Sequence, residues 1–463
     1  MITMDKKDDS SFRDPNGFVF FSDGAVYRQI NGRYRQDYDH LMKSGLYAAL
    51  ADAGLLILHE EVERSFPKNS EAYKIIKPEP IPFLSYPYEW CFSQLKHAAL
   101  TTLSIQLKAM AYGMSLKDCS GYNIQFADGK PIFIDTLSFE RYQEGEPWVA
   151  YRQFCQHFLA PLALMSQTDF RLSSLLRVHL DGIPVDLASR LLPCRTRFKS
   201  SLLLHVHLHA MGQQKFAQKT AKPKHRGISR ASLAGLFSSL ESAVNGLEWK
   251  PKGTVWADYY QATNYSDDSM AEKRRIVADY LDKIKPRTLW DFGANTGVFS
   301  RLSSSKGIRT ISFDFDMACV ERNYLESIRN GDKQLLPLVM DLANPSPGIG
   351  WHHRERKSLM DRGPAGVVLC LAIIHHLAIS CNVPFARLAE FLAASCESLI
   401  IEFVPKEDSN VQRLLSIRKD VFMDYTIENF EKEFKQYFSL RSRALISGSG
   451  RVLYLFQRRQ DTI

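Results

Sequence analysis

A glycine-containing turn followed by a downstream acid gives this sequence its clearest chemistry. Residues 289–300 read LWDFGANTGVFS, and the next apolar run, RTISFDFD, reaches Asp314. Glycines at 293 and 297 let the backbone turn tightly and approach a ligand closely. A helix starting after Gly297 offers free N–H groups to a polar ligand, and a carboxylate such as Asp314 can accept hydrogen bonds from both hydroxyls of a ribose. The pattern predicts a site for a ligand that contains a ribose.

Two adjacent histidines, His375 and His376, follow the apolar run GVVLCLAII. An imidazole just past the end of a strand can take a proton from a hydroxyl or amine that is about to react. We therefore expect His376, and after it His375, to be catalytic or to contact the substrate. The alternative is that one of them packs and satisfies local backbone groups. Glu402, in the run LIIEFV, is a further candidate to orient a substrate or to cap its strand.

The pattern around these positions predicts the elements that hold them. Downstream of about residue 251, apolar runs of strand length alternate with helical patterns such as that over 269–284. This alternation predicts a parallel sheet covered by helices on both faces. Two final runs near the C-terminus fit an added antiparallel hairpin. The runs expected to form parallel strands are RTLWDFG, RTISFDFD, LLPLVMD, AGVVLCL and SLIIEFV.

This part of the chain, residues 251–463, resembles the class I S-adenosylmethionine-dependent methyltransferases. Their first motif, Asp-x-Gly-x-Gly-x-Gly, is matched by DFGANTG, with Asn295 in place of the middle glycine. Asparagine tolerates a positive φ better than most residues. The resemblance implies an α/β fold with a Rossmann-like doubly wound sheet, S-adenosyl-L-methionine as cofactor, and methyl transfer. A dinucleotide-binding Rossmann enzyme is the rival interpretation, although the pattern GxGxxG does not occur here.

The resemblance also implies which residues bind the cofactor. Gly293 and Gly297 would lie against its methionine part, Asp314 would bind the ribose, and Asp341 would lie near the adenine amine. The run that ends at Leu371 matches the motif beside the reacting methyl group. The complete expected set is Asp291, Gly293, Asn295, Gly297, Asp314, Asp341 and Leu371, and no metal is expected.

An aromatic and polar segment precedes the helix expected over 269–284. It contains Trp256, Tyr259, Tyr260 and Tyr265. By similarity to the methyltransferases, these rings are expected to cover the mouth of the cofactor site. Ordinary packing at the start of the helix is the alternative.

The N-terminal half holds a second group of polar residues, within YGMSLKDCSGYNIQFADGKPIFIDTLSF. Asp118 follows a long helix expected over 91–112, Asn123 comes five positions later, and Asp135 ends a strand after an Asp-Gly turn. Three such side chains can converge on Mg²⁺ and a nucleophile. The order resembles the catalytic loop and metal-binding aspartate of the protein-kinase-like and aminoglycoside-phosphotransferase-like folds. A small strand-containing lobe and a larger helical lobe are then implied.

The match departs from those families in ways that predict a degenerate site. Ser-Leu-Lys precedes Asp118 where a histidine-containing triplet is usual, and Thr-Leu-Ser follows Asp135. The segment FFSDGAV offers one glycine where a phosphate-covering loop has several. We expect a kinase-like fold used for binding or scaffolding, with weak or no ATP binding. An active phosphotransferase and an unrelated helical domain stay open as alternatives.

Length and charge set the domain organisation. A chain of 463 residues is too long for one compact core. No acidic residue occurs between Asp186 and Glu241, and this stretch is rich in Lys and Arg. The sequence predicts an N-terminal α+β domain over 1–215, a basic linker over 216–250 and a methyltransferase domain over 251–463.

The composition limits which partners and which cellular compartment are expected for this protein. The net charge of +8 permits an anionic partner, but no nucleic-acid module is recognisable. No apolar run is long enough to span a membrane, and eight scattered cysteines indicate reduced thiols in a cytoplasm. We expect methylation of a small molecule or carbohydrate-type metabolite; the sequence sets no oligomeric state. The alternatives are a non-catalytic binding or regulatory protein and a bifunctional kinase–methyltransferase.

Overall fold

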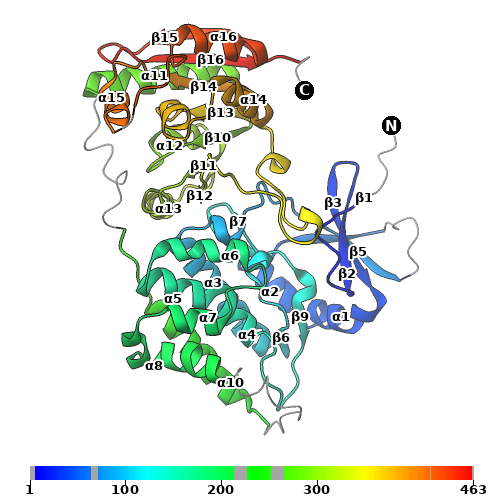
Figure 1. Cartoon of the computed structure of the whole chain (residues 1–463). Coiled ribbons are helices and arrows are strands. Elements are labelled where there is room, and N and C mark those ends of the chain that lie inside the picture. Colours follow the sequence, from blue (N-terminus) through cyan, green and yellow to red (C-terminus); the bar gives the residue numbers. More distant parts are fainter. Residues whose placement is uncertain (1–5, 64–70, 213–226, 252–264, 418, 461–463) are drawn as a thin grey trace. The chain divides into compact units, whose positions relative to one another are not determined.

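The fold was obtained as a computed structural model, which describes residues 6–63, 71–212, 227–251, 265–417 and 419–460. The chain divides into two compact units. The first consists of Met1–Lys250 with Gly350–Arg356, and the second of Pro251–Ile349 with Lys357–Ile463. Figure 1 labels the elements of each unit. No helix among the described residues is both long enough and apolar enough to cross a membrane.

The second unit is built on a seven-stranded sheet in the order β12-β11-β10-β13-β14-β16-β15. Strands β10 to β14 run parallel, whereas β16 is antiparallel to both β14 and β15. The order reverses around β10, so loops at the carboxyl ends of β10 and β13 diverge and leave a crevice. The strands are β10 (Thr288–Phe292), β11 (Arg309–Asp314), β12 (Leu335–Val339), β13 (Ala365–Cys370), β14 (Cys396–Phe403), β15 (Phe438–Leu445) and β16 (Val452–Arg458).

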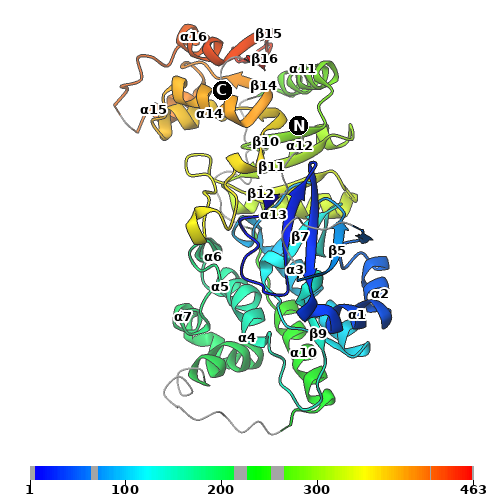
Figure 2. The same ribbon diagram turned by 90° about the vertical axis from the view of Figure 1, so that its right-hand side faces the viewer.

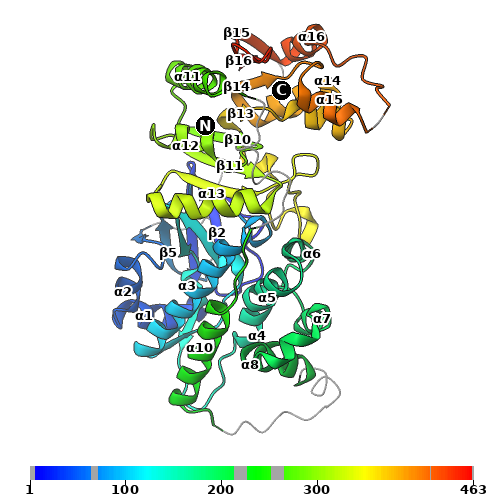
Figure 3. The same ribbon diagram turned by 90° about the vertical axis from the view of Figure 1, so that its left-hand side faces the viewer.

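Helices cover both faces of this sheet, as the alternating pattern predicts. Figures 2 and 3 show α11 and α12 on one side of it and α14 and α16 on the other. The helices are α11 (Asp267–Ile284), α12 (Val298–Ser304), α13 (Met317–Asn330), α14 (Phe385–Ser395), α15 (Ser409–Leu415) and α16 (Ile427–Tyr437). The Rossmann-like fold expected for this part of the chain is confirmed.

Apolar side chains join the helices to the sheet on each face. Val277 and Tyr280 of α11 are buried in a cluster with Leu289 of β10. On the opposite face, the ring of Phe391 from α14 stacks on Phe292, with centroids 6.0 Å apart. Successive strand residues point to opposite faces, so Leu289 and Asp291 both face α11.

The first unit contains a five-stranded antiparallel sheet in the order β1-β2-β3-β5-β4, drawn in blue in Figure 1. A hairpin in this sheet turns at Asp23-Gly24, where both residues have positive φ. Two short helices follow the hairpin and are separated by Gly45, which has a φ of 84°. The elements are β1 (Lys6–Lys7), β2 (Gly17–Ser22), β3 (Ala25–Asn31), α1 (Arg35–Lys43), α2 (Leu46–Asp52), β4 (His59–Val62) and β5 (Ala72–Pro78).

A larger, mostly helical part follows this sheet. The long helix expected over 91–112 is confirmed as α3 (Phe92–Ala111), and a short strand connects it to the loop that holds Asp118. The short strands are β6 (Met114–Leu116), β7 (Ile124–Ala127), β8 (Lys130–Phe133) and β9 (Phe139–Arg141). The helices after them are α4 (Tyr151–Phe154), α5 (Ala160–Gln167), α6 (Leu175–Val178), α7 (Val185–Leu191), α8 (Ser200–Leu202) and α10 (Arg230–Asn245).

The boundaries differ from the sequence prediction in two places. The basic linker predicted over 216–250 is wrong from residue 230 onward, because α10 buries Leu233 and Phe237 within the first unit. Residues 216–226 of that linker lie outside the described residues. The segment Gly350–Arg356 belongs to the first unit, although it falls inside the predicted methyltransferase domain. Buried Glu355 explains this, because both of its oxygens accept hydrogen bonds from Arg13.

Candidate cofactor-binding site

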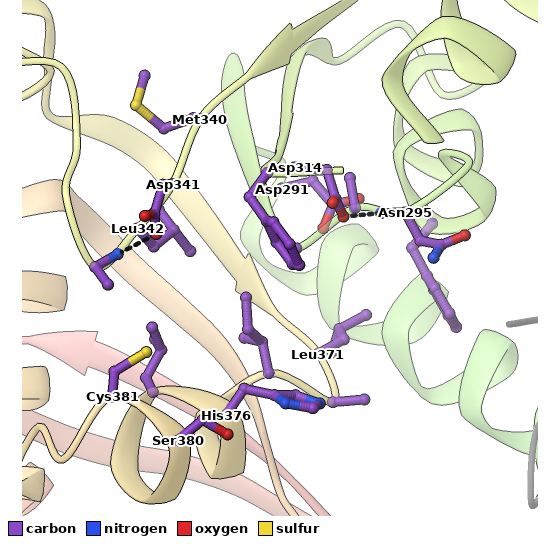
Figure 4. Close-up of a pocket in the computed structure, with 18 of the residues that line it drawn as sticks. Asp291, Asn295, Asp314, Met340, Asp341, Leu342, Leu371, His376, Ser380 and Cys381 are labelled. Atoms are coloured by element: carbon purple, nitrogen blue, oxygen red, sulfur yellow. Dashed lines mark hydrogen bonds between the residues drawn. The ribbon is translucent and has the colours of Figure 1, made fainter. Parts of the chain in front are cut away.

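A cavity of about 460 Å³ lies at the carboxyl ends of the parallel strands in the second unit (Figure 4). Its volume is in the range of sites for small molecules and cofactors. The residues contributed at these strand ends are Asp291, Gly293, Ala294, Asn295, Asp314, Phe315, Met340, Asp341, Leu342, Ala343, Leu371, Ala372 and Ile373. The remaining wall is formed by Tyr265, Met270, Lys273, Phe299, His376, Leu377, Ser380, Cys381 and Leu414.

The turn after β10 has the geometry that its glycines suggest. Gly293 has a φ of 73°, and a Cβ built there would fall 2.5 Å from Cδ1 of Ile373 on the facing wall. Asn295 has a φ of 50°, so this asparagine does adopt the left-handed conformation. Gly297, with a φ of 81°, precedes α12 and packs against Asn323 rather than lining the cavity. The absence of a side chain at Gly293 therefore keeps the cavity open.

Asp314 places a buried carboxyl group in the cavity. Its Oδ2 accepts a hydrogen bond from the backbone N–H of Asn295 at 2.7 Å, and its Oδ1 accepts one from the N–H of Asp316 at 2.8 Å. Burial raises the pKa of this carboxyl to about 7, although both backbone bonds oppose the rise. Because a carboxylate has about four acceptor positions, two remain for a ligand.

The other two acids of the site have different environments. Asp291 is buried, and its Oδ2 accepts a hydrogen bond of 2.6 Å from Ser300 Oγ. Burial raises the pKa of Asp291 to about 6, while Ser300 and Lys273 lower it. Asp341 is exposed on the rim, and its Oδ1 accepts from the N–H of Ala343 at 2.8 Å. Both acids line the cavity, as Figure 4 shows.

Of the two histidines, His376 lines the cavity and His375 does not. Burial lowers the pKa of His376 to about 4, with a smaller contribution from Arg451, so its imidazole is neutral at pH 7. His375 is fully buried, and neither ring nitrogen has a hydrogen-bond partner among the described residues. The two ring centroids are 4.1 Å apart. The ring of His375 thus packs beside that of His376 and does not line the cavity.

A buried cluster of charged residues lies beside the cavity. Of its members, the sequence analysis predicts a role only for Glu402. Lys273 Nζ lies 2.6 Å from Glu402 Oε2, and Arg451 Nε lies 2.7 Å from Asp408 Oδ2. The hydroxyl of Tyr265 donates to Glu402 Oε1 and accepts from Arg451 Nη1 at 2.8 Å. Glu402 thus ties α11 to the sheet and does not line the cavity.

One feature of the sequence does indicate that Lys273 is buried and paired. It stands three and four positions before Ile276 and Val277, on the buried face of α11. A charged residue on such a face needs a partner and is rarely buried without one. Of the aromatic residues expected over the cofactor mouth, Tyr265 lines the cavity. Trp256, Tyr259 and Tyr260 lie outside the described residues.

The polar group of the first unit is held by protein partners. Asp135 forms an ion pair with Arg28 Nη2 at 2.7 Å. It also accepts hydrogen bonds from Ser138 Oγ at 2.6 Å and from the N–H of Leu137 at 2.9 Å. Asp118 accepts from Gln153 Nε2 at 2.8 Å, and burial raises the pKa of its carboxyl. The described residues contain no group of three or more His, Cys, Asp or Glu placed to hold a metal ion.

The chain was compared with known proteins. It is 35% identical over 456 residues to the nodulation protein NoeA of Rhizobium meliloti (strain 1021), which covers 97% of this chain and 95% of that protein. It is similar to magnesium protoporphyrin IX methyltransferase of Synechocystis PCC 6803, solved with bound SAH, at 16% identity over 41% of this chain and 84% of that one, with a TM-score of 0.31. It is also similar to the bifunctional kinase-methyltransferase WbdD, at 16% identity over 46% of this chain and 45% of that one, with a TM-score of 0.30. No family model matches.

Proposed function

This chain belongs to the family of the nodulation protein NoeA, and we propose that its second unit binds S-adenosylmethionine and transfers the methyl group to an acceptor. The observation that carries the proposal is the buried carboxyl of Asp314, which lies in a cavity where the strand order reverses. Ligands of open α/β sheets bind at such a point. The resemblance of DFGANTG to the first methyltransferase motif supports the same assignment.

The residues of the cavity fit this cofactor. Asp314 has two acceptor positions for the ribose hydroxyls, and the neighbouring Phe315 offers an exposed ring to the adenine. Gly293 leaves room for the methionine part, because a Cβ there would meet Ile373. The acids Asp291 and Asp341 give the wall a negative character that suits a sulfonium cation.

The cofactor supplies an electrophilic methyl group, and the protein supplies position and a dry environment. A hydroxyl or amine acceptor must lose a proton during the reaction. His376 faces the cavity with a neutral imidazole at pH 7, so it can accept that proton. In this mechanism His375 supports the ring of His376 by packing behind it.

The acceptor is a small molecule or a carbohydrate-type metabolite in this proposal. Ser380 and Cys381 add polar groups to the wall near His376, in a cavity otherwise rich in apolar side chains (Figure 4). The name of the 35% identical relative, a nodulation protein, supports a methylation related to nodulation.

We propose a binding or scaffolding role for the first unit. It combines a small sheet-containing lobe with a larger helical part, and α3 leads into the loop of Asp118. The pairing of Asp135 with Arg28 argues against phosphoryl transfer, because the arginine occupies the carboxylate that would hold Mg²⁺.

Calorimetry on the full chain tests the cofactor assignment. We expect S-adenosylmethionine and S-adenosylhomocysteine to bind, and Asp314→Asn to weaken both by about 10- to 100-fold, the value of hydrogen bonds to a charged group. Asp279→Asn is the matched control, because Asp279 is exposed on α11 and pairs with Arg275. Binding of NAD without binding of S-adenosylmethionine would refute the proposal.

A further inference from the structure

One stretch of the first unit carries the excess positive charge of the chain. Between Asp186 and Glu241 there are ten Lys and Arg residues and no acid, whereas the whole chain has a net charge of +8. The rest of the chain therefore carries a small net negative charge. A basic region of this kind attracts an anionic partner.

Residues 194–212, within this stretch, also expose large apolar side chains. They form the helical turn η7 (Cys194–Phe198), α8 and the π-helix η8 (Leu203–Leu208), which continues as helix to residue 212. Phe198 is 90% exposed, and Leu204, Leu208 and Met211 are each about half exposed. These last three side chains recur at intervals of four and three residues, so they lie on one face of the helix. A continuous apolar face that is open to solvent marks an interaction surface.

Basic side chains border this apolar face. Thr196 Oγ1 of η7 lies 2.9 Å from His207 Nε2 of η8, in a hydrogen bond that holds the turn against the helix. Burial lowers the pKa of His207, and Arg197 lowers it further, which places this exposed cation beside the helix. Lys199 Nζ donates to the side-chain oxygen of Gln167 at 2.9 Å. Because Gln167 is neutral, this contact leaves the positive charge of Lys199 uncompensated.

We infer that this basic-apolar surface docks the first unit onto an anionic lipid membrane. The surface is formed by Phe198, Leu204, Leu208 and Met211 with Arg197 and Lys199. Figures 1 and 3 show α8 at the margin of the helical part, away from the five-stranded sheet. The inference goes beyond methyl transfer, because it requires neither the cofactor nor the cavity of the second unit. It names a partner for the binding role proposed for the first unit and in that respect rests on it.

Apolar and cationic side chains on one surface match the two layers of a membrane leaflet. Lys and Arg bind anionic headgroups, while Phe, Leu and Met enter the boundary between headgroups and acyl chains. In a two-fold dimer of this chain, the surface would meet itself and bring cations against cations. A nucleic acid would satisfy the cations through its phosphates but would leave the aliphatic side chains exposed. An anionic membrane satisfies both kinds of side chain.

Sedimentation of the full chain with lipid vesicles tests the inference. We expect the wild type to bind vesicles made of phosphatidylglycerol and phosphatidylcholine in equal amounts. Vesicles of phosphatidylcholine alone should bind at least about 25-fold more weakly, because Arg197 and Lys199 contribute about fivefold each near an anionic surface. Raising the salt concentration should release the protein, because salt screens exposed charges.

Two variants locate the surface. Phe198→Ser should weaken binding to the anionic vesicles by about tenfold, because an apolar side chain no longer leaves water. Arg197→Gln should weaken it by about fivefold, the contribution of one cation. Both residues are exposed, so neither change removes a buried contact. Leu58→Ser and Lys130→Gln are the matched controls and should bind like the wild type, because both residues are exposed elsewhere in the first unit.

The outcomes separate the possible partners. A wild type that does not bind anionic vesicles, or that binds neutral vesicles equally well, would overturn the inference. Unchanged vesicle binding in both Phe198→Ser and Arg197→Gln would overturn it as well. A dimer in analytical ultracentrifugation that Phe198→Ser dissociates, or a DNA duplex that displaces the vesicles, would assign the surface to that partner instead. Titration of the same preparations with S-adenosylhomocysteine and with ATP reports separately on the proposed function.

Discussion

The pH dependence of cofactor binding follows from the state of Asp314. Burial raises the pKa of this carboxyl to about 7, and the ribose hydroxyls need an ionised acceptor. With a pKa of about 7, roughly nine tenths of the carboxyl is ionised at pH 8 and one tenth at pH 6. We therefore expect the affinity for S-adenosylhomocysteine to fall by about tenfold from pH 8 to pH 6. The affinity is highest above the pKa and declines as the pH drops through it.

Proton release gives the same prediction a second readout. Binding favours the ionised carboxyl, so at pH 7 the complex should release about half a proton. Calorimetry in two buffers of different ionisation enthalpy measures this number directly. Asp291, with a pKa of about 6, also titrates in this range, whereas His376 stays neutral because its pKa is about 4.

The variant Asp314→Asn isolates the contribution of Asp314. It should bind weakly and lose most of the pH dependence, leaving only the slope that Asp291 contributes. Asp279→Asn should follow the wild-type curve, since Asp279 is exposed, pairs with Arg275 and does not line the cavity. A wild-type affinity that is constant from pH 6 to pH 8, or a slope in Asp314→Asn as steep as that of the wild type, would show that this carboxyl does not hold the ligand.

Three further predictions concern other residues. His376→Ala should keep cofactor affinity and slow methyl transfer by about 10²-fold; unfolding of the variant in a thermal melt would instead assign His376 to packing. Arg451→Met should lower the free energy of unfolding by about 3–5 kcal/mol, because Asp408 stays buried without its cation; urea denaturation measures this, and a loss below about 1 kcal/mol would contradict it. The full chain should bind ATP weakly or not at all in the presence of Mg²⁺, because Arg28 holds Asp135; micromolar affinity by calorimetry that Asp135→Asn abolishes would overturn this.

The strand ends of the second unit are the part of the fold that sequence reasoning locates best. The resemblance to the methyltransferases implies that Asp291, Asp314 and Asp341 share one site, and parallel strands do place their carboxyl ends at one edge of the sheet. All three line the cavity. The reason is local: each acid follows an apolar run long enough to form a strand. Gly297 does not line the cavity, and its lack of a side chain leaves room for Asn323.

Glu402 was a candidate from the sequence, but its pairing with a distant lysine could not be predicted. Lys273 and Glu402 are 129 positions apart, and the residues around each give no indication that the two form an ion pair. The helix α10 was missed for a different reason. Its apolar residues Leu233, Phe237, Leu240 and Val244 repeat at helical spacing, but the run of basic residues before it favours a linker. Because His375 and His376 are adjacent in the sequence, their positions alone do not determine which of the two rings faces the cavity.

The donors that contact Asp135 and Asp314 distinguish these two carboxylates. Asp135 accepts from a backbone N–H and a hydroxyl and is also paired with Arg28, so its charge is compensated within the protein. Among the described residues, Asp314 accepts from two neutral N–H groups and has no cationic partner, and burial raises its pKa to about 7. An acid with a full set of partners stabilises a fold. An acid that lies in a cavity with acceptor positions left over can accept donors from a ligand, and this difference supports the binding proposed for the second unit.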